Sequence, residues 1–231
     1  MKSAFDAYGE SYDDVMKKSI GFIGQKHDYY TQAKADILLD SLRRQYGATR
    51  QLSVLDVGCG IGKTDGFLSP DLGKLTGVDV SSASIERARR ENPDVQYEVY
   101  DGRSLPFDNA TFDAAFLICV LHHVAPEERV ALLREVRRTV RPGGSVFIFE
   151  HNPFHPLTRL AVARCEFDRD AQLLSQRAAK GLLRDAGFWL MESQYILFLP
   201  FKSKVLRGTD FLRRNVPLGA QYFVTGVNHA E

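Results

Sequence analysis

A glycine-rich turn and three acidic residues are the features of this sequence whose types and spacing could bind a ligand. The turn, GCGIG at residues 58–62, directly follows a short apolar run. Glycines at such a turn let the backbone approach a ligand closely, and the next helix offers free N–H groups to an anion. Asp56, Asp79 and Asp101 each end a stretch with the pattern of a β-strand. The combination predicts a nucleotide-like ligand held at strand ends.

The spacing of the turn distinguishes three ligands of this kind. A phosphate-binding loop of the GxxxxGK[ST] type requires a glycine where this sequence has Val57. A dinucleotide fingerprint, GxGxxG, requires its third glycine where this sequence has Lys63. The remaining ligand is S-adenosylmethionine, and charge favours it. Three strand-end acids would repel a polyphosphate, but they suit a sulfonium, an ammonium and a ribose diol, while the ligand's one carboxylate can use the helix N-terminus.

Strand and helix patterns alternate along the chain in a way that would bring these residues together. Apolar runs predict five strands, at residues 52–57, 74–80, 95–100, 114–120 and 145–150. Helical patterns lie between or after them, at residues 81–91, 126–140 and 176–185. This alternation implies βαβ units and a parallel sheet covered on both faces. Because ligands of such sheets bind at the carboxyl ends of the strands, the glycine turn and the acids should share one edge.

The two ends of the chain follow other patterns. Residues 190–199 and 220–227 look like strands without a clear crossover helix, so we expect an antiparallel pair at the edge of the sheet. A helical pattern covers residues 33–42 and suggests a cap over a pocket mouth. The stretch up to this helix is rich in aromatic residues, namely Phe5, Tyr8, Tyr12, Phe22, Tyr29 and Tyr30.

Five motifs in order resemble those of the class I S-adenosylmethionine-dependent methyltransferases. They are VLDVGCGIGKT (54–64), GVDVS (77–81), YDG with LPF (100–107), FD leading to VLHHV (112–124) and RTVRPGG (138–144). Each motif alone is weak, but five in the family's order are specific. The resemblance implies an α/β, Rossmann-like, doubly wound sheet of seven strands, mostly parallel with an antiparallel last strand. It also implies one methyltransferase domain over residues 1–231, with a helical N-terminal cap (1–50), a cofactor-binding half (51–150) and an acceptor-side half (151–231).

The resemblance implies which residues would bind the methionine part of S-adenosylmethionine. Gly58 and Gly60 would pack against it, with Cys59 in the same turn, and Asp56 would anchor its amino group through water. The backbone carbonyl of Leu117 would also accept from this amine.

The resemblance assigns the nucleoside part of the cofactor to two further motifs. Asp79 would accept both ribose hydroxyls, with Val80 beside it. The side chain of Asp101 would accept from the adenine amino group, and the backbone N–H of Gly102 would donate to adenine N1. Helix capping is the alternative role of each strand-end acid, but three acids in register favour ligand binding.

Three histidines at the same sheet edge could serve the methyl acceptor. His123 and His151 are candidate general bases, because histidine titrates near neutrality and can deprotonate a hydroxyl. We expect His122 to contact the substrate. The alternative for the 122–123 pair is a structural one, in which a ring bonds the backbone and shapes the loop.

The segment EHNPFHPLTR at residues 150–159 is the most individual part of the sequence. Its two prolines are expected to keep it out of regular structure. Asn152 could bond an acceptor hydroxyl and Arg159 could meet an acceptor anion, whereas the alternative is a merely structural lid. EHNP resembles segments of bacterial methyltransferases of polysaccharide or secondary-metabolite pathways. This favours a small-molecule or glycan-type acceptor, methylated at a hydroxyl oxygen in a bacterial biosynthetic pathway.

Composition narrows the remaining possibilities. A net charge of +1 gives no reason to expect nucleic acid as a partner. We expect a cytoplasmic protein, because its three cysteines lie far apart and its N-terminus does not resemble a signal peptide. We expect no membrane span, because the sequence has no long apolar run. The protein is expected to be a monomer or a homodimer. No metal is expected, because the set that can be drawn, His151, His155, Cys165 and Asp168, lacks any ligand spacing. The open alternatives are a C- or N-methyltransferase of a quinone, polyketide or amine, and a non-catalytic cofactor-binding module.

Overall fold

The computed structural model describes residues 27–197 and 216–229, and it contains one seven-stranded sheet. The strands are β1 (Ser53–Val57), β2 (Lys74–Asp79), β3 (Gln96–Val99), β4 (Phe112–Ile118), β5 (Val140–His151), β6 (Phe188–Ile196) and β7 (Gln221–Asn228). The α-helices are α2 (His27–Tyr46), α3 (Asp65–Leu68), α4 (Ser82–Glu91), α5 (Arg129–Thr139), α6 (Pro156–Arg164) and α7 (Gln176–Asp185). Short 3-10 turns cover Thr49–Gln51, Ser69–Asp71 and Leu121–His123.

The strand order is β3-β2-β1-β4-β5-β7-β6. Strands β1 to β5 are parallel, and β7 runs antiparallel between β5 and β6. This confirms the predicted doubly wound sheet with an antiparallel last strand. The order reverses between β1 and β4, and in such sheets the crevice at that reversal is the preferred ligand site.

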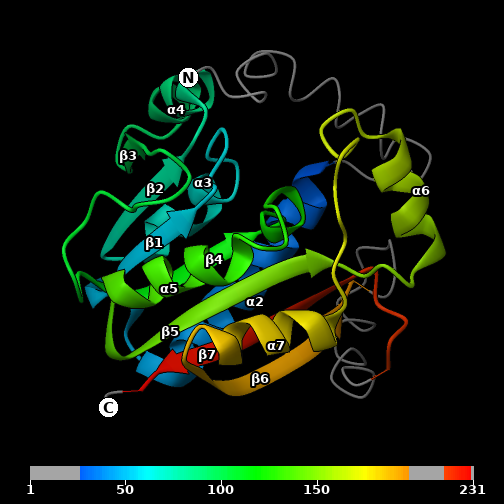
Figure 1. Ribbon diagram of the computed structural model, residues 1–231. Coiled ribbons are helices and arrows are strands. Elements are labelled where there is room, and N and C mark those ends of the chain that lie inside the picture. The colour runs from blue at the N-terminus through cyan, green and yellow to red at the C-terminus, as the bar shows by residue number, and fades with distance from the viewer. Residues whose placement is uncertain (1–26, 198–215, 230–231) are drawn as a thin grey trace.

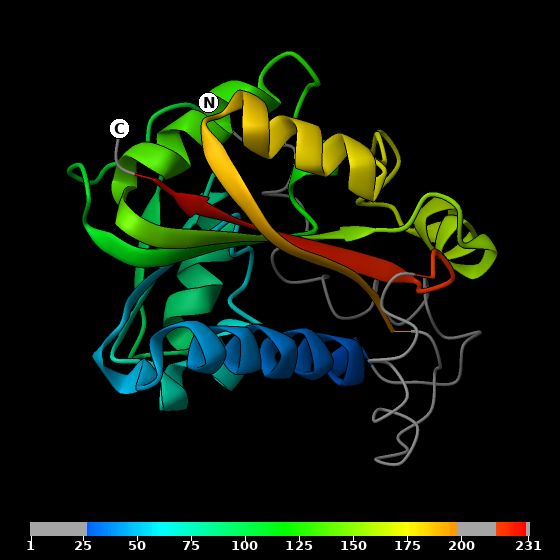
Figure 2. The same cartoon turned by 90° about the horizontal axis from the view of Figure 1, so that it is seen from below.

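Helices cover both faces of the sheet, as Figures 1 and 2 show. On one face, α2 and α4 bury apolar side chains such as Leu38, Leu42 and Ile85 against Phe116 and Phe149. On the other face, α5 and α7 contribute Leu133, Val136 and Leu183 to a second core. Because both faces are buried, β4 is apolar along almost its whole length, as its sequence predicts.

The sequence locates most elements to within a few residues of their observed bounds. Helix α7 has the predicted bounds, and the Ser81 side chain caps α4 by accepting from the backbone N–H of Ser84. The predicted strand at 190–199 is β6, of which residues 198 and 199 lie outside the described part. Of the aromatic residues named in the sequence analysis, Tyr29 and Tyr30 lie within α2, and the other four lie outside the described part.

The expectation that two prolines keep residues 150–159 out of regular structure is wrong. Pro156 is the first residue of α6, where its missing N–H has no partner to lose and its fixed φ suits a helix. The ring of His155 caps this helix, with Nδ1 3.2 Å from the backbone nitrogen of Thr158. The second proline therefore starts a helix, which stands beside the end of β5 (Figure 1).

Among the described residues, none of the helices combines the length and the apolar character needed to cross a membrane.

Candidate cofactor and acceptor site

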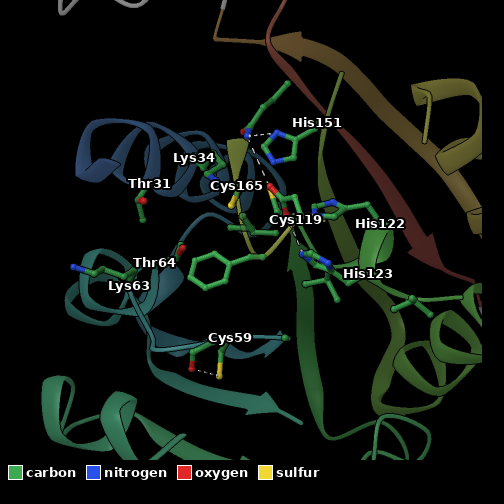
Figure 3. A pocket seen from close by; sticks show the side chains of 18 of the residues that line it. Thr31, Lys34, Cys59, Lys63, Thr64, Cys119, His122, His123, His151 and Cys165 are labelled. Carbon is green, nitrogen blue, oxygen red and sulfur yellow. Dashed lines mark hydrogen bonds and ion pairs between the residues drawn. The ribbon is translucent and has the colours of Figure 1, made fainter. Parts of the chain in front are cut away.

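A cavity of about 510 Å³ opens at the carboxyl ends of the central strands. One half is lined by the glycine turn and the ends of β1 and β2, including Asp56, Gly58, Gly60, Asp79 and Val80. The other half is lined by α2, by the segment after β4, by the end of β5 and by α6 with the loop that follows it. Figure 3 shows these two halves facing each other. The strand order thus places the predicted ligand residues and the predicted acceptor residues in one cavity.

The glycine turn has a backbone shape that other residues would strain. Gly58 has φ of 79°, and a Cβ atom there would lie 2.6 Å from Cγ2 of Val120. The backbone N–H of Gly58 donates to the carbonyl of Val78 over 2.7 Å, which ties the turn to β2. A left-handed glycine packed against a neighbouring loop leaves its backbone facing the cavity, where a ligand can approach it.

Asp79 is tied to the same turn. Its Oδ2 accepts from the backbone N–H of Gly60 over 2.8 Å, and its Oδ1 accepts from that of Ser81 over 2.8 Å. The residue is 9% exposed and lines the cavity. Because each carboxylate oxygen can accept more than one hydrogen bond, both oxygens retain capacity for a diol.

Asp56 is paired with an acid that the sequence analysis did not single out. Asp56 and Asp65 are both buried and hydrogen bond to each other through their carboxyl groups, and Tyr97 Oη donates to Asp65 over 2.8 Å. Burial, with the charge of Asp65, raises the pKa of Asp56 well above its usual range. Burial raises the pKa of Asp65 to about 6. The pair therefore holds a shared proton under the glycine turn. In the sequence, Asp65 could have been recognised as an acidic residue at the start of the helix that follows the glycine turn.

The cofactor half fits S-adenosylmethionine in charge. Two carboxyl groups, Asp56 and Asp79, line it, and the nearby Lys63 is paired with Asp28 at 4.0 Å. A cationic ligand is therefore favoured over a polyphosphate. Gly102, with φ of 80°, and Val80 line the same half, and so does Cys59, whose thiol has a pKa raised by burial and by Asp56.

Two residues assigned to the cofactor by resemblance lie elsewhere. Asp101 is exposed and does not line the cavity, and its Oδ1 accepts from the backbone N–H groups of Arg103 and Ser104. Its side chain thus shapes a turn, as in the capping alternative. Leu117 is fully buried within β4, and the cavity wall begins at Ile118 and continues with Cys119.

Two residues that were predicted to bind the methyl acceptor also lie outside the cavity lining. The Asn152 side chain is buried, donates to the carbonyls of Pro217 and Gly219, and accepts from the backbone N–H of Phe154. Its hydrogen bonds hold the loop before β7, so it does not line the cavity. Arg159 is exposed on α6 and does not line the cavity. The roles predicted for these two residues are therefore not supported by their positions.

The acceptor half contains a cation from α2 that the sequence analysis did not predict. Lys34 is 7% exposed and lines the cavity, with Thr31 one helical turn before it. Figure 3 shows both side chains on the wall formed by α2. No carboxylate of the described residues forms an ion pair with Lys34. The polar and apolar residues of α2 alternate in a way that does not predict which of its polar side chains face the cavity.

The three predicted histidines do come together in the acceptor half, and all three line the cavity. The rings of His122 and His123 have centroids 4.1 Å apart, and those of His122 and His151 lie 5.3 Å apart. His122 Nδ1 lies 2.6 Å from Oε2 of Glu150. His151 Nδ1 lies 3.1 Å from the side-chain nitrogen of Gln221.

Neighbouring charges give these histidines opposite pKa shifts. Burial alone would lower the pKa of His122, but the carboxylates of Glu150 and Asp168 outweigh it and raise this pKa well above its usual range. Burial, together with the charge of His122, lowers the pKa of both His123 and His151 to about 4. His123 and His151 are thus neutral at physiological pH.

Two acids at this wall were not predicted as site residues. Glu150 is 1% exposed at the end of β5 and also accepts from the backbone N–H of Leu121 over 2.8 Å. Asp168 lies in the loop after α6, with Oδ1 3.4 Å from Nε2 of both His122 and His123. This loop is anchored by the bond from Gln172 N–H to the His122 carbonyl. An acid ending a buried strand was the signal for Glu150, but no local pattern identifies Asp168.

Comparisons with known proteins agree with this architecture. A family model described as "Methyltransferase domain" matches residues 54–144. An O-methyltransferase of Penicillium expansum is 31% identical over 201 residues, covering 81% of this chain and 72% of its own. A tRNA (carboxymethyluridine(34)-5-O)-methyltransferase of Saccharomyces cerevisiae is 44% identical over 96 residues, which are 41% of this chain and 34% of its own.

Among solved structures, the complex of the Haloferax volcanii Trm112 methyltransferase activator with a putative methyltransferase has the same fold. It matches over 100% of both chains with a TM-score of 0.70 and 21% identity. The glycine turn, the acids beside it and these relatives lead to one assignment. The chain belongs to the class I S-adenosylmethionine-dependent methyltransferases and is an enzyme that uses this cofactor.

Proposed function

We propose that this methyltransferase acts on a small-molecule acceptor at a hydroxyl oxygen, with His151 as the general base. The observation that carries the proposal is the composition of the acceptor half. It combines apolar side chains from α6, such as Leu157 and Ala161, with a neutral, half-buried histidine and the buried cation of Lys34. An apolar cavity with few polar groups is typical of small-molecule sites. The relative named as an O-methyltransferase supports oxygen as the acceptor atom.

The proposed roles in cofactor binding follow the cavity lining. Gly58 and Gly60 would hold the methionine part, Asp56 its ammonium, and Asp79 the ribose diol. Bound there, S-adenosylmethionine supplies an electrophilic methyl group on a sulfonium. The enzyme's own contribution is to hold the acceptor oxygen in line with that methyl group, to exclude water and to remove the hydroxyl proton.

Gln221 determines whether His151 can accept this proton. In the present orientation, the amide nitrogen of Gln221 faces Nδ1, while its Oε1 is buried without a donor among the described residues. A half-turn of the amide brings Oε1 to Nδ1–H, which satisfies the buried oxygen and leaves Nε2 of His151 as the base. We assign proton removal to this tautomer. His123, the other predicted base, faces Asp168 instead.

Lys34 provides the proposed means of acceptor recognition. A buried ammonium without a carboxylate partner is unfavourable unless a ligand meets it. We infer that the acceptor carries a phenolate, carboxylate or similar anionic group on the side facing α2. A glycan-type acceptor is disfavoured by the apolar side chains of α6. Curated relatives come from fungi and from bacteria, so a bacterial biosynthetic pathway stays a prediction.

A methyl-transfer assay with labelled S-adenosylmethionine tests this proposal. The purified chain is offered phenolic and hydroxy acids, quinols, amines, sugars and bulk tRNA, and each product is analysed for the methylated atom. We expect O-methylated anionic aromatics. With such an acceptor, His151→Ala should lower kcat ~10²-fold or more at unchanged cofactor affinity. Methylation of carbon, nitrogen or tRNA alone, or a fully active His151→Ala variant, would contradict the proposal.

A further inference from the structure

Three donor atoms of metal-binding type converge on the acceptor side of the cavity. They come from the side chains of His122, His123 and Asp168, each of which offers one ligand atom, and these atoms all lie within 4.8 Å of one another. Each of the three residues lines the cavity. Figure 3 shows the two histidines on the same wall, at the end of β4. The sequence predicted no metal, because the set considered there, His151, His155, Cys165 and Asp168, lacks any ligand spacing; it did not include His122 or His123.

The distances from Asp168 to the two histidines are longer than those of most hydrogen bonds. Oδ1 of Asp168 lies 3.4 Å from Nε2 of His122 and 3.4 Å from Nε2 of His123. A hydrogen bond between N–H and oxygen is shorter, at about 2.7–3.2 Å. By contrast, two ligands that are each about 2.1 Å from a tetrahedral ion lie about 3.4 Å apart. The two Asp168–histidine separations therefore also fit two ligands around a bound ion.

The surroundings of His122 provide a second, independent observation. Its Nε2 is buried and has no hydrogen-bond partner among the described residues. Its Nδ1 faces Oε2 of Glu150 at 2.6 Å, and both side chains are 1% exposed. A carboxylate that accepts from Nδ1–H orients the ring so that Nε2 can ligate a metal ion in place of its own proton, as in most histidines that ligate metals. Glu150 is itself held by the backbone N–H of Leu121.

We propose that His122, His123 and Asp168 bind a divalent transition-metal ion of the Zn²⁺ class, with Glu150 orienting His122. Two imidazoles and one carboxylate form a ligand set that such ions prefer over Mg²⁺ or Ca²⁺. Three protein ligands leave a fourth position, and the cluster borders the cavity, so this position is open to a ligand there. At that position the ion would bind the acceptor oxygen. This second role, unlike metal binding itself, rests on the proposed function.

Metal titration of the full chain tests the site directly. The protein is treated with a chelator, exchanged into chelator-free buffer and titrated with Zn²⁺ by calorimetry, and with Co²⁺ by visible absorption. We expect one equivalent of each ion to bind and the Co²⁺ form to show the strong absorption of tetrahedral coordination. His123→Gln and Asp168→Asn should each weaken binding about 100-fold or more, and Glu150→Gln about 10–100-fold.

A matched control comes from another histidine of the same cavity. His155→Asn keeps a good cap for α6 and leaves the cluster intact, so its Zn²⁺ affinity should equal that of the wild type. Thermal unfolding confirms that each variant is folded before titration. Absence of one-equivalent Zn²⁺ binding in the wild type would overturn the proposal, and so would equal affinity in the His123→Gln and Asp168→Asn variants. Calorimetry with S-adenosylmethionine separates this outcome from a failure of the cofactor site.

Discussion

The Asp65→Asn substitution examines the buried acid pair beneath the glycine turn. Asparagine keeps the shape of the side chain and can still accept from Tyr97 Oη, whose present distance to Asp65 is 2.8 Å. Its amide nitrogen can donate to Asp56, which takes over the role of the shared proton. The substitution thus removes a buried charge without removing a hydrogen bond.

The pKa of Asp65 gives the magnitude and the sign. A rise from 3.8 to about 6 on folding means that the native state binds the proton more tightly than the unfolded state does. The free energy of unfolding therefore falls as the pH rises from about 4 to about 6, by about 3 kcal/mol at about 1.4 kcal/mol for each unit. Because asparagine has no proton to lose, the free energy of unfolding of the variant should not decrease in this way as the pH rises. The variant should be up to about 3 kcal/mol more stable at pH 8 and about equal at pH 4.

Urea unfolding followed by circular dichroism at several pH values between 4 and 8 measures this difference. Asp71→Asn, which changes an exposed acid paired with Arg43, is the control and should shift stability by less than about 1 kcal/mol. A variant no more stable than the wild type at pH 8, or a difference that does not change with pH, would refute the account. The same loss of negative charge should weaken S-adenosylmethionine binding by about 1 kcal/mol, roughly fivefold, in calorimetry.

Three further substitutions test other parts of the site. Asp79→Asn should weaken cofactor binding by about 1–3 kcal/mol in calorimetry, and an unchanged affinity would exclude the ribose role. Gly58→Ala should cost about 2–4 kcal/mol in urea unfolding because of its positive φ and the approach to Val120. The control Gly181→Ala, which has open space around it in α7, should instead stabilise the protein by about 0.5–1 kcal/mol. Lys34→Met should raise KM for an anionic acceptor about tenfold or more without changing cofactor affinity, and an unaltered KM would remove Lys34 from acceptor recognition.

The cofactor half was predictable because it depends on short-range patterns. Strand ends and turns are visible in sequence, and parallel strands necessarily gather their carboxyl ends on one edge. The sequence alone therefore predicts that Gly58 and Asp79 lie at the same edge of the sheet. Asp101 was placed on the right loop, but its side chain bonds the backbone two and three residues ahead, an alternative that sequence cannot weigh. The position of Leu117 depended on where β4 ends, and element boundaries are the least certain part of such predictions.

The acceptor half could not be predicted in the same way, because it is assembled from segments far apart in the chain. Lys34 comes from the face of α2 that turns to the cavity, and Asp168 from a loop whose position is set by a hydrogen bond to His122. Asn152 looked like a substrate ligand because polar residues near a sheet edge often are. In the structure, its amide instead satisfies two carbonyls of the loop before β7.

His122 is held by acids from two separate parts of the fold. Glu150 and Asp168 contact the same histidine from two different segments, one on the rigid sheet and one on a loop. The sheet-borne partner contacts His122 alone of the two histidines, whereas the loop-borne partner faces both His122 and His123. Substitutions in the loop after α6 should therefore change which acceptor is used while leaving the cofactor half intact, because Asp56 and Asp79 lie on β1 and β2 and depend on neither segment.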